Sequence, residues 1–236
     1  MKRTAFYDAV RSTLFGGKLS QSQVAGIDTL LDELERNAVA LEQAAYVLAG
    51  VYHETGRKMV PVREGFASTD AGARAAVKKL FEKGRIKTNY AAPVNGVSYY
   101  GRGRIQNTWL ANYEKLEKRF GRPFVKQPDL LLDDAIDAEV TVVGHVEGIW
   151  TGKKLADYIG AGKKDYKGAR RIVNGTDKAA MIAGYAESFE KALKAADYSG
   201  KTAIAPKPVV PTAPPKAGWL SALIKALVAI FKGGKK

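Results

Sequence analysis

The chain has no cysteine and only two histidines, His53 and His145, among its 236 residues. The absence of cysteine excludes disulfides, thiolate metal sites and a cysteine nucleophile. Two histidines also argue against a histidine-rich metal centre, so we expect neither a metal nor a cofactor. A chain that needs no disulfide to fold suits synthesis in a reducing cytoplasm.

Long apolar runs are missing as well. No apolar stretch of signal-peptide length follows residues 1–8, so we expect no secretory signal. The apolar stretch over residues 219–231 is 13 residues long and contains a lysine. It is too short to span a bilayer, because a spanning helix needs about 20 residues.

Acidic residues are fewer than basic ones, 24 against 38, which gives a net charge of +14. Residues 199–236 contain seven lysines and no acidic residue, so this tail carries half of the excess. Such a charge favours anionic partners. Nucleic acid, an anionic membrane and an anionic polymer such as a bacterial cell wall all fit the composition.

Apolar residues make up 46% of the chain, which is enough for a sizeable core. Apolar residues at helical spacing predict helices over 24–34, about 38–53, 70–81, 108–120, 133–150 and 176–195. Residues 20–23 look like the cap of the first of these helices, and Asp70 like the N-cap of the third. Strand-like alternation is scarce, with a short hairpin near 94–100 as the best candidate. We therefore predict a mainly α fold with at most a small β element.

The composition divides the chain into three parts, 1–198, 199–217 and 218–236. Five of the nine prolines fall in the middle part, which predicts a semi-rigid, extended linker. The last part is a strongly amphipathic helix typical of binding to an anionic membrane or lipopolysaccharide. Its predicted membrane-binding residues are Trp219, Leu220, Leu223, Ile224, Lys225, Leu227, Val228, Phe231 and Lys232. A helix that docks on the first part or mediates oligomers, and a fused peptide, are the alternatives.

One segment is typical of a cleft that holds sugar rings. It reads Tyr99-Tyr100-Gly101-Arg102-Gly103-Arg104-Ile105-Gln106-Asn107-Thr108. Tyrosine rings stack on pyranose faces, glycines allow close approach of the backbone, and Gln and Thr hydrogen-bond hydroxyls or a water molecule. The sequence therefore suggests an enzyme that cleaves carbohydrate.

Two carboxyl groups are candidates for the acid and the base of such an enzyme. Glu54 lies at the predicted C-terminal end of a helix, where the helix dipole and partial burial favour the protonated form that a general acid needs. Glu64 follows on a proline-containing loop and could reach the opposite wall of a cleft. Both could equally be solvated surface charges. Asp70 competes with Glu64 but is better explained as a helix cap.

Several spaced motifs together resemble glycoside hydrolase family 19, which contains chitinases and related phage endolysins. They are His53-Glu54-Thr55-Gly56, the segment Tyr99–Thr108 with Asn112-Tyr113 after it, Gln127-Pro128-Asp129-Leu130 and Arg170-Arg171-Ile172-Val173-Asn174-Gly175. The match runs in the family's order over most of residues 40–195. It implies a lysozyme-like α-helical catalytic domain over residues 1–198, with a deep cleft.

The resemblance also implies roles for individual residues. Glu54 would be the general acid, Glu64 the base that activates water, and Thr108 would position that water. The substrate-binding residues would be Tyr100 lining the cleft, Arg102 organising the carboxylates, Gln106 and Asn112 on sugar groups, and Arg171 and Asn174 closing the cleft. The implied reaction is a single displacement with inversion. Arg104 and Asn107 depart from the family pattern near the expected cleft floor.

A cationic amphipathic tail has no evident use on chitin, which is nearly uncharged, whereas peptidoglycan carries acidic peptides beside anionic membranes. We therefore predict a monomeric phage-type endolysin that cleaves β-1,4 bonds of peptidoglycan and does not bind nucleic acid. It would accumulate in the host bacterial cytoplasm until lysis and then act on the cell wall. The alternatives are a chitinase and a membrane-active antibacterial protein whose domain only binds glycan.

Overall fold

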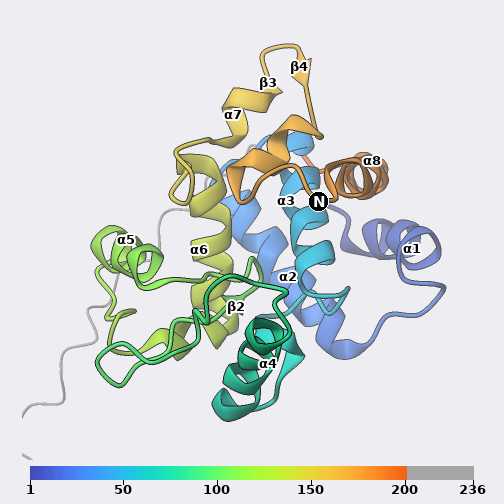
Figure 1. Ribbon diagram of the computed structural model, residues 1–236. Coiled ribbons are helices and arrows are strands. Elements are labelled where there is room, and N and C mark those ends of the chain that lie inside the picture. Colours follow the sequence, from blue (N-terminus) through green and yellow to red (C-terminus); the bar gives the residue numbers. More distant parts are fainter. Residues whose placement is uncertain (201–236) are drawn as a thin grey trace, which may run out of the picture. The chain divides into compact units, whose positions relative to one another are not determined.

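The computed structural model describes residues 1–200 of the chain. The predicted linker from residue 201 onward, and the whole predicted amphipathic helix at 218–236 with its membrane-binding residues, lie outside the described residues. The described part is mainly α-helical, as predicted (Figure 1). None of its helices is long and apolar enough to cross a membrane.

Eight α-helices and three short 3-10 helices occur among residues 1–200. The α-helices are α1 (Arg3–Thr13), α2 (Gln21–Arg36), α3 (Leu41–Glu54), α4 (Asp70–Glu82), α5 (Leu110–Phe120), α6 (Asp134–Glu147), α7 (Leu155–Tyr158) and α8 (Ala179–Ala195). The 3-10 helices are η1 (Glu64–Phe66), η2 (Pro128–Leu132) and η3 (Gly168–Ile172). The six predicted helices correspond to α2 through α6 and to α8, while α1 and the short α7 were not predicted.

The helix caps follow local chemistry. The Ser20 hydroxyl accepts a hydrogen bond from the Gln23 amide, and the Gln23 side chain accepts one from the Ser20 amide, which forms a reciprocal cap on α2. The predicted cap on α4 was wrong by one residue. The Thr69 side chain, and not Asp70, accepts the hydrogen bond from the Gly72 amide. Asp70 is thereby free to pair with arginines.

The β structure is small and mostly outside the predicted hairpin. Between residues 94 and 100 a single bridge joins Val94 to Val97. The paired strands are instead β1 (Val62–Arg63) with β2 (Arg102–Gly103), and β3 (Ile159–Gly160) with β4 (Lys163–Lys164), both antiparallel. The first pair matters for function because it joins the loop after α3 to the segment 99–108.

Helix α3 lies at the centre of the fold (Figure 1). Every residue from 44 to 52 is buried, and a helix that is apolar on all sides must be covered all round. It packs most extensively on α8, which in turn contacts α1, while α2 packs on α6. Beyond Tyr52 the helix leaves the core, and its last two residues, His53 and Glu54, are partly exposed.

Candidate active site

Glu54, the last residue of α3, forms an ion pair with Arg170 of η3. Arg170 Nη1 lies 2.6 Å from Glu54 Oε1, and the exposed fractions of the two side chains are 5% and 20%. A second contact positions the Arg170 side chain, because its Nε donates a hydrogen bond to the carbonyl of Asp177 at 3.2 Å. Burial and, to a smaller extent, the charge of Arg170 lower the pKa of the nearby His145 to about 4. The pair therefore fixes the direction of the Glu54 carboxylate.

Glu64 opens the turn η1, beside the segment 99–108. Its amide donates to the carbonyl of Gly101 at 2.7 Å, and its Oε2 accepts from the Gly101 amide at 3.1 Å. Partial burial, followed by the charge of Glu64, raises the pKa of Tyr90 to about 12. The Glu64 carboxylate thus lies next to two separate parts of the chain, the segment 99–108 at Gly101 and the loop after α4 at Tyr90.

The segments that carry Glu54 and Glu64 are in direct contact. Gly56, two residues after Glu54, has a φ of +55°, and a Cβ at this position would lie 2.9 Å from Phe66 Cζ. Phe66 itself lies two residues after Glu64. The positive φ and the close approach together favour glycine at position 56. The structure therefore brings the predicted acid and base to one locality.

Gly101 is required by the same crowding on the other side of Glu64. A Cβ there would lie 2.6 Å from Glu64 Oε2 and 2.7 Å from Gln106 Oε1. Gln106 has a φ of +55°, which is unusual for a residue other than glycine. Its amide nitrogen donates to the carbonyls of Val62 and Gly103 at 3.1 and 2.9 Å. Gln106 thus lies beside Glu64 with its oxygen directed toward the same space as the carboxylate.

Thr108 and Asn112 form a short chain of hydrogen bonds that leads from Gln106. The Thr108 hydroxyl donates to the carbonyl of Gln106 at 2.9 Å, and the Asn112 side chain donates to the carbonyl of Thr108 at 2.8 Å. Both side chains are partly buried. Since the Thr108 hydroxyl donates its proton to the backbone, its oxygen can accept a hydrogen bond from water.

Tyr100 and Arg102 do not face a substrate in this structure. Tyr100 is fully buried, with the Arg102 guanidinium carbon 3.7 Å from its ring centroid. Arg102 is 2% exposed and pairs with Asp129 at 2.7 Å and Asp70 at 3.4 Å. Its carboxylate partners are therefore neither Glu54 nor Glu64. The two side chains instead stabilise the segment 99–108 internally. Arg102 connects this segment to α4 through Asp70 and to η2 through Asp129.

Arg104 and Asn107, the departures from the family pattern, are also internal. Arg104 is fully buried and pairs with Asp137 of α6 at 3.0 Å. The Asn107 side chain is 2% exposed and accepts a hydrogen bond from Trp150 Nε1 at 2.8 Å. These residues connect the segment to α6 and to the chain that follows it. Arg104 and Asn107 therefore stabilise the segment from the protein interior and do not line the expected cleft.

Arg171 and Asn174 are exposed. The Asn174 side chain accepts a hydrogen bond from the amide of Gly175 at 2.8 Å, and the contact with Glu54 is made by the neighbouring Arg170. Adjacent residues of a 3-10 helix point in different directions, roughly a third of a turn apart. The sequence offered no signal that would choose between the two arginines.

Trp109 and Tyr90 were also missed as site residues. Trp109 is 49% exposed, and its ring centroid lies 5.4 Å from that of Tyr90. It has a φ of +74°, a conformation that costs a bulky residue about 1–3 kcal/mol and is found most often at functional sites. The exposed indole directly after Thr108 could have been read from the sequence, whereas nothing in the sequence marks Tyr90.

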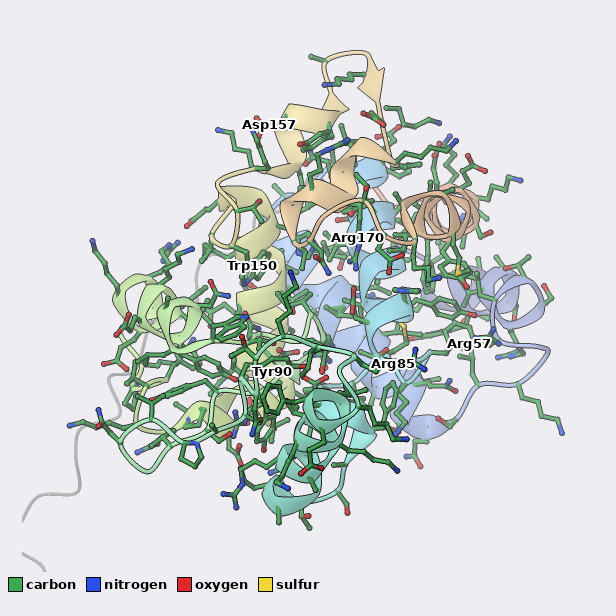
Figure 2. The ribbon with its side chains drawn as sticks, in the orientation of Figure 1. Arg57, Arg85, Tyr90, Trp150, Asp157 and Arg170 are labelled. Carbon is green, nitrogen blue, oxygen red and sulfur yellow. The ribbon has the colours of Figure 1, made fainter. Side chains whose placement is uncertain are left out.

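Figure 2 shows the positions of Arg170 and Tyr90, which come from distant parts of the sequence. Arg170 comes from η3, in front of α3, and Tyr90 comes from the loop that follows α4. Within residues 1–200 no group of three or more histidine, aspartate or glutamate side chains is arranged to hold a metal ion.

No protein-family model matches the chain, and no curated protein sequence matches it significantly. Among solved structures it is similar to chitinase C from Streptomyces griseus HUT6037, with a TM-score of 0.50 and 19% sequence identity. The match covers 84% of this chain and 76% of the chitinase chain. The described part of the chain therefore has a chitinase-like, mainly α-helical fold.

Proposed function

We propose that the protein is a glycoside hydrolase that cleaves β-1,4 bonds in the glycan strands of bacterial peptidoglycan. The observation that carries this proposal is the placement of Glu54 and Glu64. They are two partly buried carboxylates on segments that touch at Gly56 and Phe66. A pair of carboxylates on facing segments is what glycoside hydrolysis needs.

In the proposed reaction Glu54 gives a proton to the glycosidic oxygen, and Glu64 takes one from the attacking water. The bond between the anomeric carbon and the leaving oxygen breaks as the bond to the water oxygen forms. Glu54 ends as a carboxylate beside the Arg170 guanidinium, which stabilises that charge. The Thr108 hydroxyl oxygen accepts a hydrogen bond from the same water. The product would have the inverted configuration.

The substrate would lie along the groups that remain exposed. The Trp109 indole and the Tyr90 ring offer an apolar platform for the face of a sugar. Gln106 and Asn112 stand on either side of Thr108 and would hydrogen-bond sugar groups. Arg171 and Asn174 are exposed on the loop beyond η3 and could close over the strand.

Chitin is the second candidate substrate, because the protein of similar fold is a chitinase. Chitin and peptidoglycan share the β-1,4-linked N-acetylated backbone, so the carboxylates alone do not separate the two. The composition favours peptidoglycan, since the net charge of +14 suits an acidic polymer.

The C-terminal part supports a role in lysis. Residues 218–236 have the lysines and the apolar face of an interfacial helix, and we propose that they bind anionic membrane or lipopolysaccharide. The protein would then act as a phage-type endolysin, released from the host cytoplasm onto the cell wall. In the competing proposal this helix is the active agent and the domain only binds glycan.

The test is mass spectrometry of the reducing ends released from purified peptidoglycan by the full chain and by Glu54→Gln. We expect reducing N-acetylmuramic acid from the unaltered chain and a loss of about 10²–10⁴-fold in Glu54→Gln, the usual contribution of a general acid. Glu187→Gln, an exposed glutamate of α8, is the matched control and should retain full activity.

Other outcomes distinguish the alternatives. Reducing N-acetylglucosamine would change the bond assigned to the enzyme but not its class. Cleavage of chitin without cleavage of peptidoglycan would favour the chitinase. Killing that survives Glu54→Gln but not deletion of 218–236 would favour the membrane-active protein.

A further inference from the structure

A group of cations without ion-pair partners borders the two carboxylate segments. Residues 57–91 contain nine lysines and arginines and three acidic residues. The three acids do not neutralise the group, because Arg74 pairs with Asp70 and Lys78 with Glu82. Six exposed cations of this stretch have no ion pair with any residue of the described part: Arg57, Lys58, Lys79, Lys83, Arg85 and Lys87. We call these six residues the cationic rim.

Two members of the rim, three and four residues after Glu54, each contact an aromatic ring. Lys58 Nζ lies 4.9 Å from the centroid of Phe66, and the Arg57 guanidinium carbon lies 5.7 Å from the centroid of Tyr52. The backbone of Arg57 is also fixed, since its amide donates to the carbonyl of Tyr52 at 2.8 Å. These charges are positioned by cation–π contacts rather than neutralised by carboxylates.

The other four members lie on α4 and the loop after it. Gly65, next to Glu64, packs on α4, because a Cβ at Gly65 would lie 3.0 Å from the Cβ of Ala76. Lys79 and Lys83 follow Ala76 by three and seven residues and so share that face of the helix. The chain then turns, and the amide of Arg85 donates to the carbonyl of Leu80 at 2.9 Å.

The two groups of cations are linked through the turn at Phe66. In the view of Figure 2, Arg57 and Arg85 both lie below Arg170. The Phe66 turn connects them, since Phe66 contacts Lys58 while the adjoining Gly65 contacts α4. The rim therefore borders the contact between the segments that carry Glu54 and Glu64.

We propose that the cationic rim binds the carboxylates of the peptides attached to the glycan strand, and that it selects peptidoglycan over chitin. This inference rests on the proposed function. A strand held against Glu54 and Glu64 would carry its peptides past the rim, so both contacts form on one molecule. Chitin has no carboxylate to offer and would gain nothing from these charges.

A lipid surface is the main competitor for the rim, because Phe66 and Phe81 are 50% and 44% exposed beside it. The position of Phe66 argues against this occupant. Phe66 belongs to the turn that begins at Glu64, and a bilayer bound there would cover the carboxylate that must meet the glycan. One face of the Phe66 ring is also occupied by the Lys58 ammonium.

The test compares two full-length triple variants on two forms of the same peptidoglycan. The rim variant is Lys83→Ser, Arg85→Ser, Lys87→Ser. The control is Lys118→Ser, Lys126→Ser, Lys191→Ser, which removes the same charge from exposed positions on α5, the loop after it and α8. One substrate is untreated, and in the other all carboxyl groups are capped as neutral amides.

We expect the rim variant to lose about tenfold in kcat/KM on untreated peptidoglycan, mainly through KM, as three weak exposed charge contacts would give. On the capped substrate the rim variant, the control and the unaltered chain should agree within about twofold. The rim effect should also shrink as salt is added.

Equal losses on both substrates, or no loss on either, would overturn the proposal. So would a loss of binding to vesicles of phosphatidylglycerol and phosphatidylcholine without a loss on untreated peptidoglycan. If the unaltered chain cleaves neither substrate, the proposed function fails instead. The rim is then tested by binding alone. The fraction of Glu54→Gln that sediments with insoluble peptidoglycan is measured with and without the three rim substitutions, and a lower fraction with the substitutions would support the rim.

Discussion

The helices around α3 and the segment 101–107 are both buried, but they are buried by different chemistry. Around α3 most of the buried side chains are apolar, as in Phe6, Leu48 and Phe189. In the segment the two largest buried side chains are charged, and Arg102 and Arg104 are also the largest fully buried side chains in the described part of the chain. Apolar contacts hold helices together without fixing direction, whereas each guanidinium fixes the backbone at several defined points. The stretch that looks most like a binding motif is therefore largely the internal support of the site.

The largest expected effect comes from breaking this buried charge. Arg104→Met should lower the free energy of unfolding by about 3–5 kcal/mol, because it leaves the Asp137 carboxylate buried without a cationic partner. Ile27→Val, in the apolar region, should cost only about 0.5–1.5 kcal/mol. Denaturant unfolding monitored by circular dichroism measures both.

The double variant Arg104→Met, Asp137→Leu sharpens the comparison. Removing both charges should recover part of the lost stability, since the unpaired carboxylate is then gone. A double variant that is less stable than Arg104→Met alone would show that the cost comes from the backbone carbonyls that Arg104 also contacts, such as that of Met59.

The sequence predicted the fold well because its signal is periodic and local. Apolar spacing indicated α2 through α6 and α8, and the cap at Ser20 has the expected hydrogen bonds. Helices α1 and α7 and the pairing of β1 with β2 were missed. The strand pairing depends on contacts between residues about forty positions apart, which no local pattern reports.

The site could be predicted only in part. Glu54 and Glu64 are brought together by segments in contact, and their catalytic roles stay predictions. Tyr100, in contrast, is fully buried beneath Arg102. A motif specifies residue types, but it does not say which side of the backbone faces solvent. That choice depends on α4, η2 and α6, whose contacts with the segment are long-range.

The second prediction concerns His145, a buried polar group within the apolar region. Burial lowers its pKa to about 4, against 6.5 for an ordinary histidine. Below pH 6.5 the unfolded chain binds a proton that the folded chain does not, so stability falls as the pH drops toward 4. The expected loss over this window is roughly 3 kcal/mol relative to His145→Gln, in which the titrating group is absent.

Unfolding by denaturant at pH 7, 5.5 and 4 measures this difference. Burial raises the pKa of Asp137 to about 6 and so acts in the opposite direction, but it does so equally in both proteins. Parallel pH profiles for the unaltered chain and His145→Gln would mean that His145 stays accessible to protons in the folded state.

The smallest expected effect separates two neighbouring arginines that the sequence could not rank. Arg170→Gln removes the partner of Glu54 and should lower kcat about 10–100-fold with little change in KM, because the acid loses its orientation. Arg171→Gln changes an exposed residue and should alter KM by no more than about threefold. Initial rates on purified peptidoglycan, with thermal unfolding to confirm that both variants fold, measure the difference. Arg170→Lys should restore part of the rate, because it returns the charge without the planar geometry. If Arg171→Gln proved the more damaging change, the family motif would be a better guide to this side of the site than the ion pair, and the role given to Arg170 would be wrong.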